Sequence, residues 1–354
     1  MWRVTSLLGS VVIALAIVGS GSAFAANHTS SQARAQTKAQ WQEEIATLRT
    51  PGRGCYHASF PEVTWHAVRC QSAPAVPLAP RVQTRGGPEV VGDGADYLAQ
   101  VTGKISQATG TFTHVSSGLT ENGQIGGVGA QKPNAFTLQL NTQFFKDPPE
   151  CSGAAVPSKC EGWQQFVYAY HYSGSTNEVF MQYWMLFYDT TCPAGWATDP
   201  DGKYTFCYTN SPATSFGSLP ADDLGDVKVV AHASSGGNDQ VTLTNSSTGQ
   251  ASTASNSDSK LDLASYWDGT EWGVFGDAGG AEANFGADST LEAVTALQAT
   301  SSSAPTCVAD GGTTGETNNL KLTKTKALGS ESSPTMASKQ TNGTTKTPSC
   351  AVAS

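Results

Sequence analysis

The chain has 354 residues, with 20 Lys and Arg against 29 Asp and Glu, and only 14% of its residues are charged. Its net charge of −9 argues against nucleic acid and anionic membrane surfaces as partners, since both attract basic proteins. The sparse charge, the 37 glycines and the near absence of long helical periodicity are typical of a secreted all-β protein.

Residues 1–25 have the pattern of an export signal. Arg3 provides the positive end, residues 6–19 form an apolar core, and Ala23 to Ala25 form a small-x-small cleavage site. The apolar core is too short for a comfortable membrane span, and no later stretch approaches that length. We therefore predict a secreted, extracellular protein outside the membrane, and we expect a monomer. Its mature form carries 19 basic and 29 acidic residues, a net charge of −10.

Residues 26–88 differ in composition from the rest of the chain. Apolar residues such as Trp41 and Ile45 lie on one face of a helix predicted within residues 26–50, and Pro51 ends it. A Pro-rich linker completes the region. Two interpretations stay open, namely a helical arm with a tether, or a removable propeptide.

Eight cysteines fit an oxidising compartment. Their spacings lack the CxxC and paired-His patterns of zinc sites, so we expect disulfides and neither a metal nor another cofactor. Eight cysteines allow 105 pairings, of which we choose the nearest-neighbour set. This set pairs Cys55 with Cys70, Cys151 with Cys160, Cys192 with Cys207, and Cys307 with Cys350.

Residues 89–300 read as one β-rich domain, in which short strand-like segments alternate with Gly, Ser and Asn turns. This pattern predicts an all-β fold, a sandwich of two antiparallel sheets with a short helical N-terminal arm. Residues 301–354 form a Ser/Thr-rich tail, which we expect the last cysteine pair to hold partly to the domain. The candidate strands are residues 96–101, 111–115, 135–145, 163–172, 179–188, 227–232, 240–245, 261–266, 271–275 and 291–298.

The run from Trp163 to Tyr188 places ten aromatic residues in 26 positions, with Glu178 as its single charge. It predicts two long buried strands joined by the turn SGST. A buried amide without a partner costs roughly 1–3 kcal/mol, so Gln164 and Gln165 each need a partner or a function. Strand alternation gives Gln165 the face with small side chains and Gln164 the aromatic face, a choice that a one-residue slip would reverse.

A second unusual stretch holds Glu271 between Thr270 and Trp272 in an apolar strand. Desolvation there would raise the pKa of its carboxyl group, as suits a general acid or base. The simpler interpretation is a carboxylate at an exposed strand end. The GDAGG segment that follows is similar to a serine peptidase motif, but Ala278 stands at the nucleophile position, so we reject a serine triad.

The order of these segments resembles the eqolisins, the glutamic peptidases that act in acid. The segment CEGWQQ, ending at Gln165, is similar to the family's glutamine strand, and TEWGV, containing Glu271, is similar to its glutamate strand. Between them lie a Trp/Tyr-rich strand and the turn NSSTG, as in the family. The resemblance covers residues 105–300. The family's stretch before the glutamine appears here only as AFTLQL, residues 135–140, and its Tyr-Glu-Trp-Tyr-Pro signature is replaced by YWMLFY.

The resemblance implies a concanavalin-like jelly roll that cleaves a protein or peptide substrate without a metal. It implies Gln165 and Glu271 as the catalytic pair. Glu271 would remove a proton from water, and the Gln165 amide would stabilise the oxyanion. We expect substrate contacts from Trp163, Trp184, Tyr183 and Trp272.

Two other functions stay open. A non-catalytic sandwich that binds glycans would place the tryptophans and tyrosines of the aromatic run on an open concave face. A sandwich glycoside hydrolase could use two carboxylates among Glu271, Asp277 and Glu282, held about 5–10 Å apart.

Overall fold

The computed structural model describes residues 37–74, 76–81, 97–170, 177–201, 204–308, 312–328, 334–342 and 350–353. The predicted export signal, most of the linker after residue 81 and the predicted SGST turn lie outside these residues. From Lys38 onward the chain belongs to one structural unit. No helix in the described ranges is both long and apolar enough to cross a membrane.

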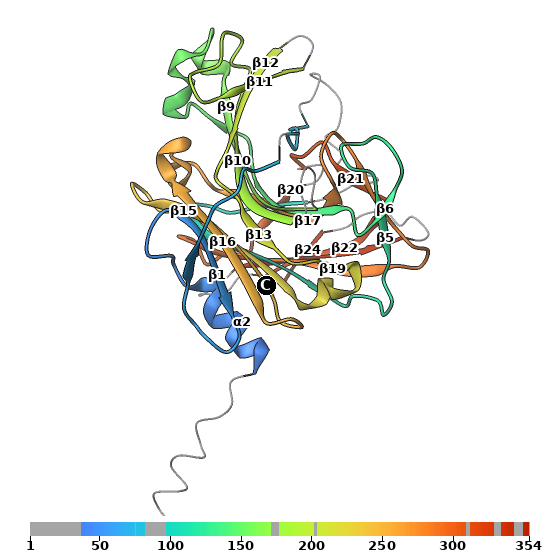
Figure 1. Cartoon of the computed structure of the whole chain (residues 1–354). Coiled ribbons are helices and arrows are strands. Elements are labelled where there is room, and N and C mark those ends of the chain that lie inside the picture. Colours follow the sequence, from blue (N-terminus) through green and yellow to red (C-terminus); the bar gives the residue numbers. More distant parts are fainter. Residues whose placement is uncertain are drawn as a thin grey trace, which may run out of the picture. The chain divides into compact units, whose positions relative to one another are not determined.

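The first of two large sheets runs antiparallel except at one edge, where β22 and β24 are parallel (Figure 1). In order across the sheet, its described strands are β2 (His66–Val68), β1 (Gly54–Ser59), β16 (Gln250–Ser257), β15 (Asn238–Asn245), β14 (Val227–His232), β4 (Ile105–Thr113), β19 (Thr290–Ala299), β23 (Thr335–Thr341), β22 (Lys321–Leu328) and β24 (Cys350–Ala353).

The second sheet packs face to face with the first and completes the predicted sandwich. Its order is β11 (Ala197–Asp201), β12 (Tyr204–Asn210), β10 (Asn177–Leu186), β9 (Glu161–Ala169), β7 (Phe136–Thr142), β17 (Gly269–Gly276), β3 (Leu98–Gln100) and β20 (Thr306–Val308), with β13 (Thr214–Phe216) on β10 and β8 (Phe145–Lys146) on β9. A small third sheet contains β21 (Thr317–Asn318), β18 (Glu282–Phe285), β5 (Glu121–Gly123) and β6 (Lys132–Pro133).

The core between the two large sheets is built by strand alternation. Phe166 and Tyr168 of β9 and Met181 of β10 point inward, against residues such as Val241 and Leu243 of β15. The central strands β7, β9, β10 and β17 are nevertheless buried on both faces. Other parts of the chain therefore cover the outer face of the second sheet.

The N-terminal arm is part of the sandwich. The helix α2 (Lys38–Thr47), drawn in blue beside β1 and β16 in Figure 1, packs on β14, β15 and β16. Its residues Trp41 and Ile45 are buried beside Tyr56 and Trp65. The region after it adds β1 and β2 to the first sheet, through antiparallel pairing of β1 with β16. Residues 38–70 are thus held to the sandwich by strand pairing, in addition to the covalent connection through the linker.

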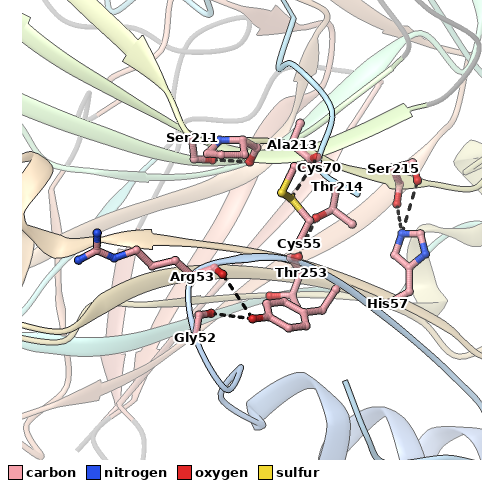
Figure 2. The surroundings of a disulfide bond; sticks show 12 residues. Gly52, Arg53, Cys55, His57, Cys70, Ser211, Ala213, Thr214, Ser215 and Thr253 are labelled. Carbon is pink, nitrogen blue, oxygen red and sulfur yellow. Dashed lines mark hydrogen bonds between the residues drawn. A yellow bond between two sulfur atoms is a disulfide. The ribbon is translucent and has the colours of Figure 1, made fainter. Parts of the chain in front are cut away.

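Three of the four predicted disulfides are confirmed: Cys55–Cys70, Cys151–Cys160 and Cys192–Cys207. Cys307 is also disulfide-bonded, but the side chain of its expected partner, Cys350, lies outside what the structure describes. Figure 2 shows the Cys55–Cys70 bond beside Ala213, at the point where β1 and the linker approach β13.

The predicted strand at residues 261–266 is wrong. The chain forms a short 3₁₀ helix, Leu263–Ser265, after Asp262 adopts a left-handed conformation with φ of 50°. The carboxylate of Asp258 accepts a hydrogen bond from the backbone N–H of Ala264 at 3.1 Å. This side-chain bond favours a turn over an extended strand, because it captures a backbone donor locally. The described residues form four other short 3₁₀ helices, Pro149–Gly153, Pro157–Lys159, Ala221–Asp226 and Asp258–Lys260.

Replacing Gly110 by Ala should destabilise the sandwich. A Cβ atom at Gly110 would lie 2.3 Å from the ring of Trp272, so the ring would have to move within the core. Overpacking of this kind costs about 1–3 kcal/mol. Urea unfolding measures the change.

Gly225→Ala is the matched control, because its Cβ would meet the nearest atom, in Val115, at 3.6 Å. We expect this control to change the free energy of unfolding by less than about 0.5 kcal/mol. Equal losses in the two variants would show that contact with Trp272 does not limit residue size at position 110.

Candidate active site

The two predicted catalytic residues are brought into one row by β7, the strand between β9 and β17. Asn141 of β7 is the cross-strand partner of Gln165 on one side and of Glu271 on the other. Cross-strand partners point to the same face, so the three side chains stand together on the outer face of the second sheet. Neighbouring strands lie about 4.8 Å apart, and the backbone of the row therefore spans roughly 10 Å.

Amide side chains connect the two ends of this row. Gln165 Nε2 donates to Gln139 Oε1 at 3.0 Å, and Asn141 Nδ2 donates to the same oxygen at 3.1 Å. Asn141 Nδ2 also donates to Glu271 Oε2 at 3.1 Å. Gln139 and Asn141 are not among the predicted site residues. The sequence pattern that indicates them is a polar residue at every second position of an otherwise apolar strand.

Glu271 lies in a dry environment with one oxygen held and one free. Its side chain is 0% exposed, and Oε2 also accepts hydrogen bonds from Thr313 N at 3.0 Å and Thr313 Oγ1 at 2.8 Å. Burial raises the pKa of Glu271, while the bonds from Thr313 and Asn141 act in the opposite direction. Glu271 Oε1 and Gln165 Oε1 have no hydrogen-bond partner within the described chain. Both oxygens are available to a water molecule or a substrate group.

The two adjacent glutamines separate as strand alternation predicts. Gln165 is on the outer face with Val167, whereas Gln164 points into the core between the sheets. Gln164 Nε2 donates to Asp239 Oδ2 at 2.9 Å, which links β9 to β15 of the opposite sheet. Gln164 thus has a structural partner.

Only two of the four residues predicted to bind substrate share the face of the row. Trp163 and Trp184 are cross-strand partners on the outer face, with ring centroids 6.2 Å apart. The prediction for Tyr183 and Trp272 is wrong, because both side chains lie in the core between the sheets. Alternation explains the error. Tyr183 directly follows Gln182 and Trp272 directly follows Glu271, and because both of these neighbours point outward, Tyr183 and Trp272 point inward.

Two segments of the chain itself cover the row. One is the end of the Pro-rich linker, residues 76–81, and the other is residues 312–316 of the tail. Leu78 N donates to Gln182 Oε1 at 2.9 Å, and Gln182 is the cross-strand partner of Gln165. Arg81 N donates to Thr313 O at 2.8 Å, so the two segments also bind each other. Gln165 is 0% exposed, like Glu271, and the site is closed in this form of the chain.

The tail also brings a second carboxyl group to the row. Glu316 is fully buried and accepts hydrogen bonds from Thr314 Oγ1 and, at 3.5 Å, from Gln139 Nε2. Burial raises its pKa to about 7. No local sequence pattern indicates Glu316 as a site residue, because it stands in a Ser/Thr/Gly-rich segment without strand periodicity.

The geometry does not favour either of the other two functions. Trp163 and Trp184 are fully buried on the outer face, and Tyr168 is buried in the core between the sheets. These rings therefore form no open platform for a sugar. Of the carboxylates considered for glycoside hydrolysis, Glu282 belongs to β18 of the small sheet and is not part of the row.

The chain was compared with known proteins. No protein-family model matches it, and no curated protein matches its sequence. Two crystal structures of scytalido-glutamic peptidase with transition-state analogues are similar at 12% and 11% identity; each comparison covers 71% of this chain and 98% of the peptidase, with TM-scores of 0.32 and 0.29. The tailspike protein 2 of the Escherichia coli O157:H7 bacteriophage CAB120 is 13% identical over 69% of this chain and 26% of its own, with a TM-score of 0.24. At such scores the likeness carries no argument about chemistry, which rests on the geometry above.

The folded chain should be more stable in acid than at pH 8. Burial raises the pKa of nine carboxyl groups, including Glu178 and Glu316 at about 7 and Glu121 at about 8. Each such group contributes stability that is complete below its unfolded pKa and is lost as the pH rises through its folded pKa. Between pH 5 and pH 8 we expect a loss of about 3 kcal/mol or more in urea unfolding.

The substitution Glu121→Gln removes one of these groups and should make the decline shallower. His232 acts in the opposite direction, because burial lowers its pKa from 6.5 to about 3, so its contribution is lost as the pH falls through that range. A free energy of unfolding that rises between pH 5 and pH 8 would contradict the expectation.

Proposed function

We propose that the chain is a glutamic endopeptidase in which Gln165 and Glu271 activate water for hydrolysis of a peptide bond. The observation that carries this proposal is the register of β7, which sets Gln165, Asn141 and Glu271 in one buried row. A carboxylate with one free oxygen and an amide with an N–H beyond the one that Gln139 accepts, held in a water-excluded site, fit the two roles of general base and oxyanion donor.

The bonds within the row assign a role to each atom. Glu271 Oε2 is held by Asn141 and Thr313, which leaves Oε1 to take a proton from the attacking water. One N–H of Gln165 is held by Gln139, which orients the amide and leaves the second N–H for the oxyanion of the tetrahedral intermediate. Glu271 then returns its proton to the leaving amine, so the proton balance closes without a covalent intermediate.

Action in acid requires that Glu271 still ionises there. Burial raises the pKa of Glu271 and favours its protonated form, whereas the hydrogen bonds from Thr313 and Asn141 lower the pKa and favour the ionised form that takes the proton from water. The raised pKa values of the other buried carboxyl groups favour the folded state in acid, and few ion pairs exist to be lost. The part of the chain that the structure describes has four ion pairs, two of which involve histidine.

Secretion is the location that we propose. The signal-like residues 1–25 support it, and so do the three described disulfides, because such bonds persist in oxidising compartments. The closed site supports synthesis as a latent form, in which the linker has to leave before a protein substrate reaches Glu271. This keeps, for the linker alone, the idea of a segment that has to leave the site, while residues 38–70 stay part of the sandwich.

Glu271→Gln should abolish acid peptidase activity while leaving the fold intact. The full chain is incubated at acid pH with an unfolded protein substrate, both untreated and after tryptic cleavage of the linker, where the sequence offers Arg81 and Arg85. We expect the nicked wild-type chain to cleave the substrate, and both Glu271→Gln and Gln165→Ala to lose about 10³-fold in rate. Mass spectrometry of the products measures each rate.

Glu121→Gln serves as the matched control, since it makes the same exchange at another buried glutamate, on β5 of the small sheet. It should retain wild-type activity. Undiminished cleavage by the Glu271→Gln chain would refute the proposal, and so would a nicked, folded wild-type chain that cleaves nothing between pH 2 and pH 5.

A further inference from the structure

The end of the linker, residues 76–81, lies between two other parts of the chain, and we call the space that it fills the groove and these two parts its walls. One wall is the outer face of the second sheet, where Leu78 N donates to Gln182 Oε1 at 2.9 Å. The other wall is the tail, where Gly315 N donates to Ala79 O at 2.8 Å and an antiparallel bridge joins Pro80 to Thr314. The linker is thus bound much as an added β-strand is bound at a sheet edge.

The side chain of Leu78 fills an apolar pocket. It is 2% exposed and belongs to a buried cluster in which it meets the outward residues of β9 and β10. The other buried members are Val167, Ala169, Phe180, Ala213 and Ala278. These residues carry no polar side-chain atom, so the pocket suits an aliphatic side chain and excludes a charged one.

The next residue of the linker points to a different region of the same face. Ala79 packs against the aromatic cluster that contains Trp163 and Trp184. On β9, Gln165 stands between Trp163 and Val167 with its side chain on this same outer face. The Leu78–Ala79 segment therefore straddles Gln165.

The linker then reaches the other end of the row. Arg81 N donates to Thr313 O at 2.8 Å, and Thr313 donates to Glu271 from both its N–H and its hydroxyl group. Residues 78–81 thus run from Gln165 towards Glu271, along the path that a bound peptide would take between the two proposed catalytic groups.

The tail wall is anchored independently of the linker. Its next residues form β21, which pairs with β18 of the small sheet. Asn318 Nδ2 donates to Val274 O at 2.8 Å, and Glu316 is bound by Gln139 and by Gly280 N. Loss of the linker would therefore leave the tail wall in place.

From this arrangement we infer that the groove is a peptide-binding site for extended chains with an aliphatic side chain at the position of Leu78, and that the tail forms its second wall. The inference rests on the proposed function and adds a substrate class to it. The hydrogen bonds to Gln182, Thr313 and Gly315 use only backbone atoms of the linker, so they do not depend on the side chains of the bound peptide. Selectivity then comes from the Leu78 pocket.

The test uses the full chain with two substitutions. Leu78→Asp places a charge in the apolar pocket and should release the linker. Hydrogen exchange measures this release as a loss of protection of the backbone amides at positions 78 and 81. Glu271→Gln prevents cleavage, so that binding is measured alone. The probes are two labelled hexapeptides, VPLAPR, which is the sequence of residues 76–81, and VPDAPR.

In fluorescence anisotropy, VPLAPR should bind the doubly substituted chain at least about tenfold more tightly than VPDAPR does, as the burial of one leucine side chain implies. The matched control is Val128→Asp with Glu271→Gln, because Val128 is 71% exposed and its charge leaves the linker in place. This control chain should bind neither peptide.

Equal affinity for the two peptides would overturn the inference. So would a folded Leu78→Asp chain in which the linker amides stay protected from exchange. A released linker with no binding of VPLAPR would overturn it as well. A separate result bears on the proposed function. If the Leu78→Asp chain with Glu271 intact binds VPLAPR but cleaves no peptide in acid, the inferred peptide-binding site is supported and the proposed catalytic roles are refuted.

Discussion

The register of β7 between β9 and β17 is the constraint on which the rest of the site depends. It aligns Asn141 with both Gln165 and Glu271, and pleating sends all three side chains to one face. The core enforces this register through Gln164, whose amide reaches Asp239 on the opposite sheet. A slip of β9 by one residue would break that bond and bring Gln165 into the apolar core. The structural glutamine therefore holds the neighbouring one in the site.

The outer face of the second sheet is unusual because it is dry. In a two-layer sandwich such a face is normally exposed to water, which hydrates the polar residues there, so placing them on it costs no free energy of desolvation. Here the linker and the tail exclude water, so every polar group of the row needs a partner within the protein. Gln139 satisfies much of this demand by accepting from two amides and donating to Thr137 and Glu316. Within the row, Gln165, Asn141 and Glu271 each keep one oxygen without a hydrogen-bond partner among the described residues.

Local patterns predicted what depends on short distances along the chain. Alternation gave the faces of Gln164 and Gln165, and nearest-neighbour spacing gave three disulfides. The same alternation places Tyr183 and Trp272 in the core, so their aromatic side chains alone do not indicate a substrate contact. The covering segments could not be predicted, because Leu78 and Thr313 reach the row from 87 residues before Gln165 and 42 residues after Glu271. Their positions depend on tertiary contacts without periodicity.

Acid alone is not expected to open the groove. Residues 71–80 of the linker carry no ionisable side chain, and they are held by backbone hydrogen bonds and by burial of Leu78, neither of which titrates. The facing Glu271 and Glu316 favour their buried, protonated forms as the pH falls, so acid does not repel the cover from within. We therefore expect a cut in the linker, and not acid alone, to open the groove of the wild-type chain. The Cys55–Cys70 bond and the pairing of β1 with β16 would then keep residues 38–70 attached while the linker leaves.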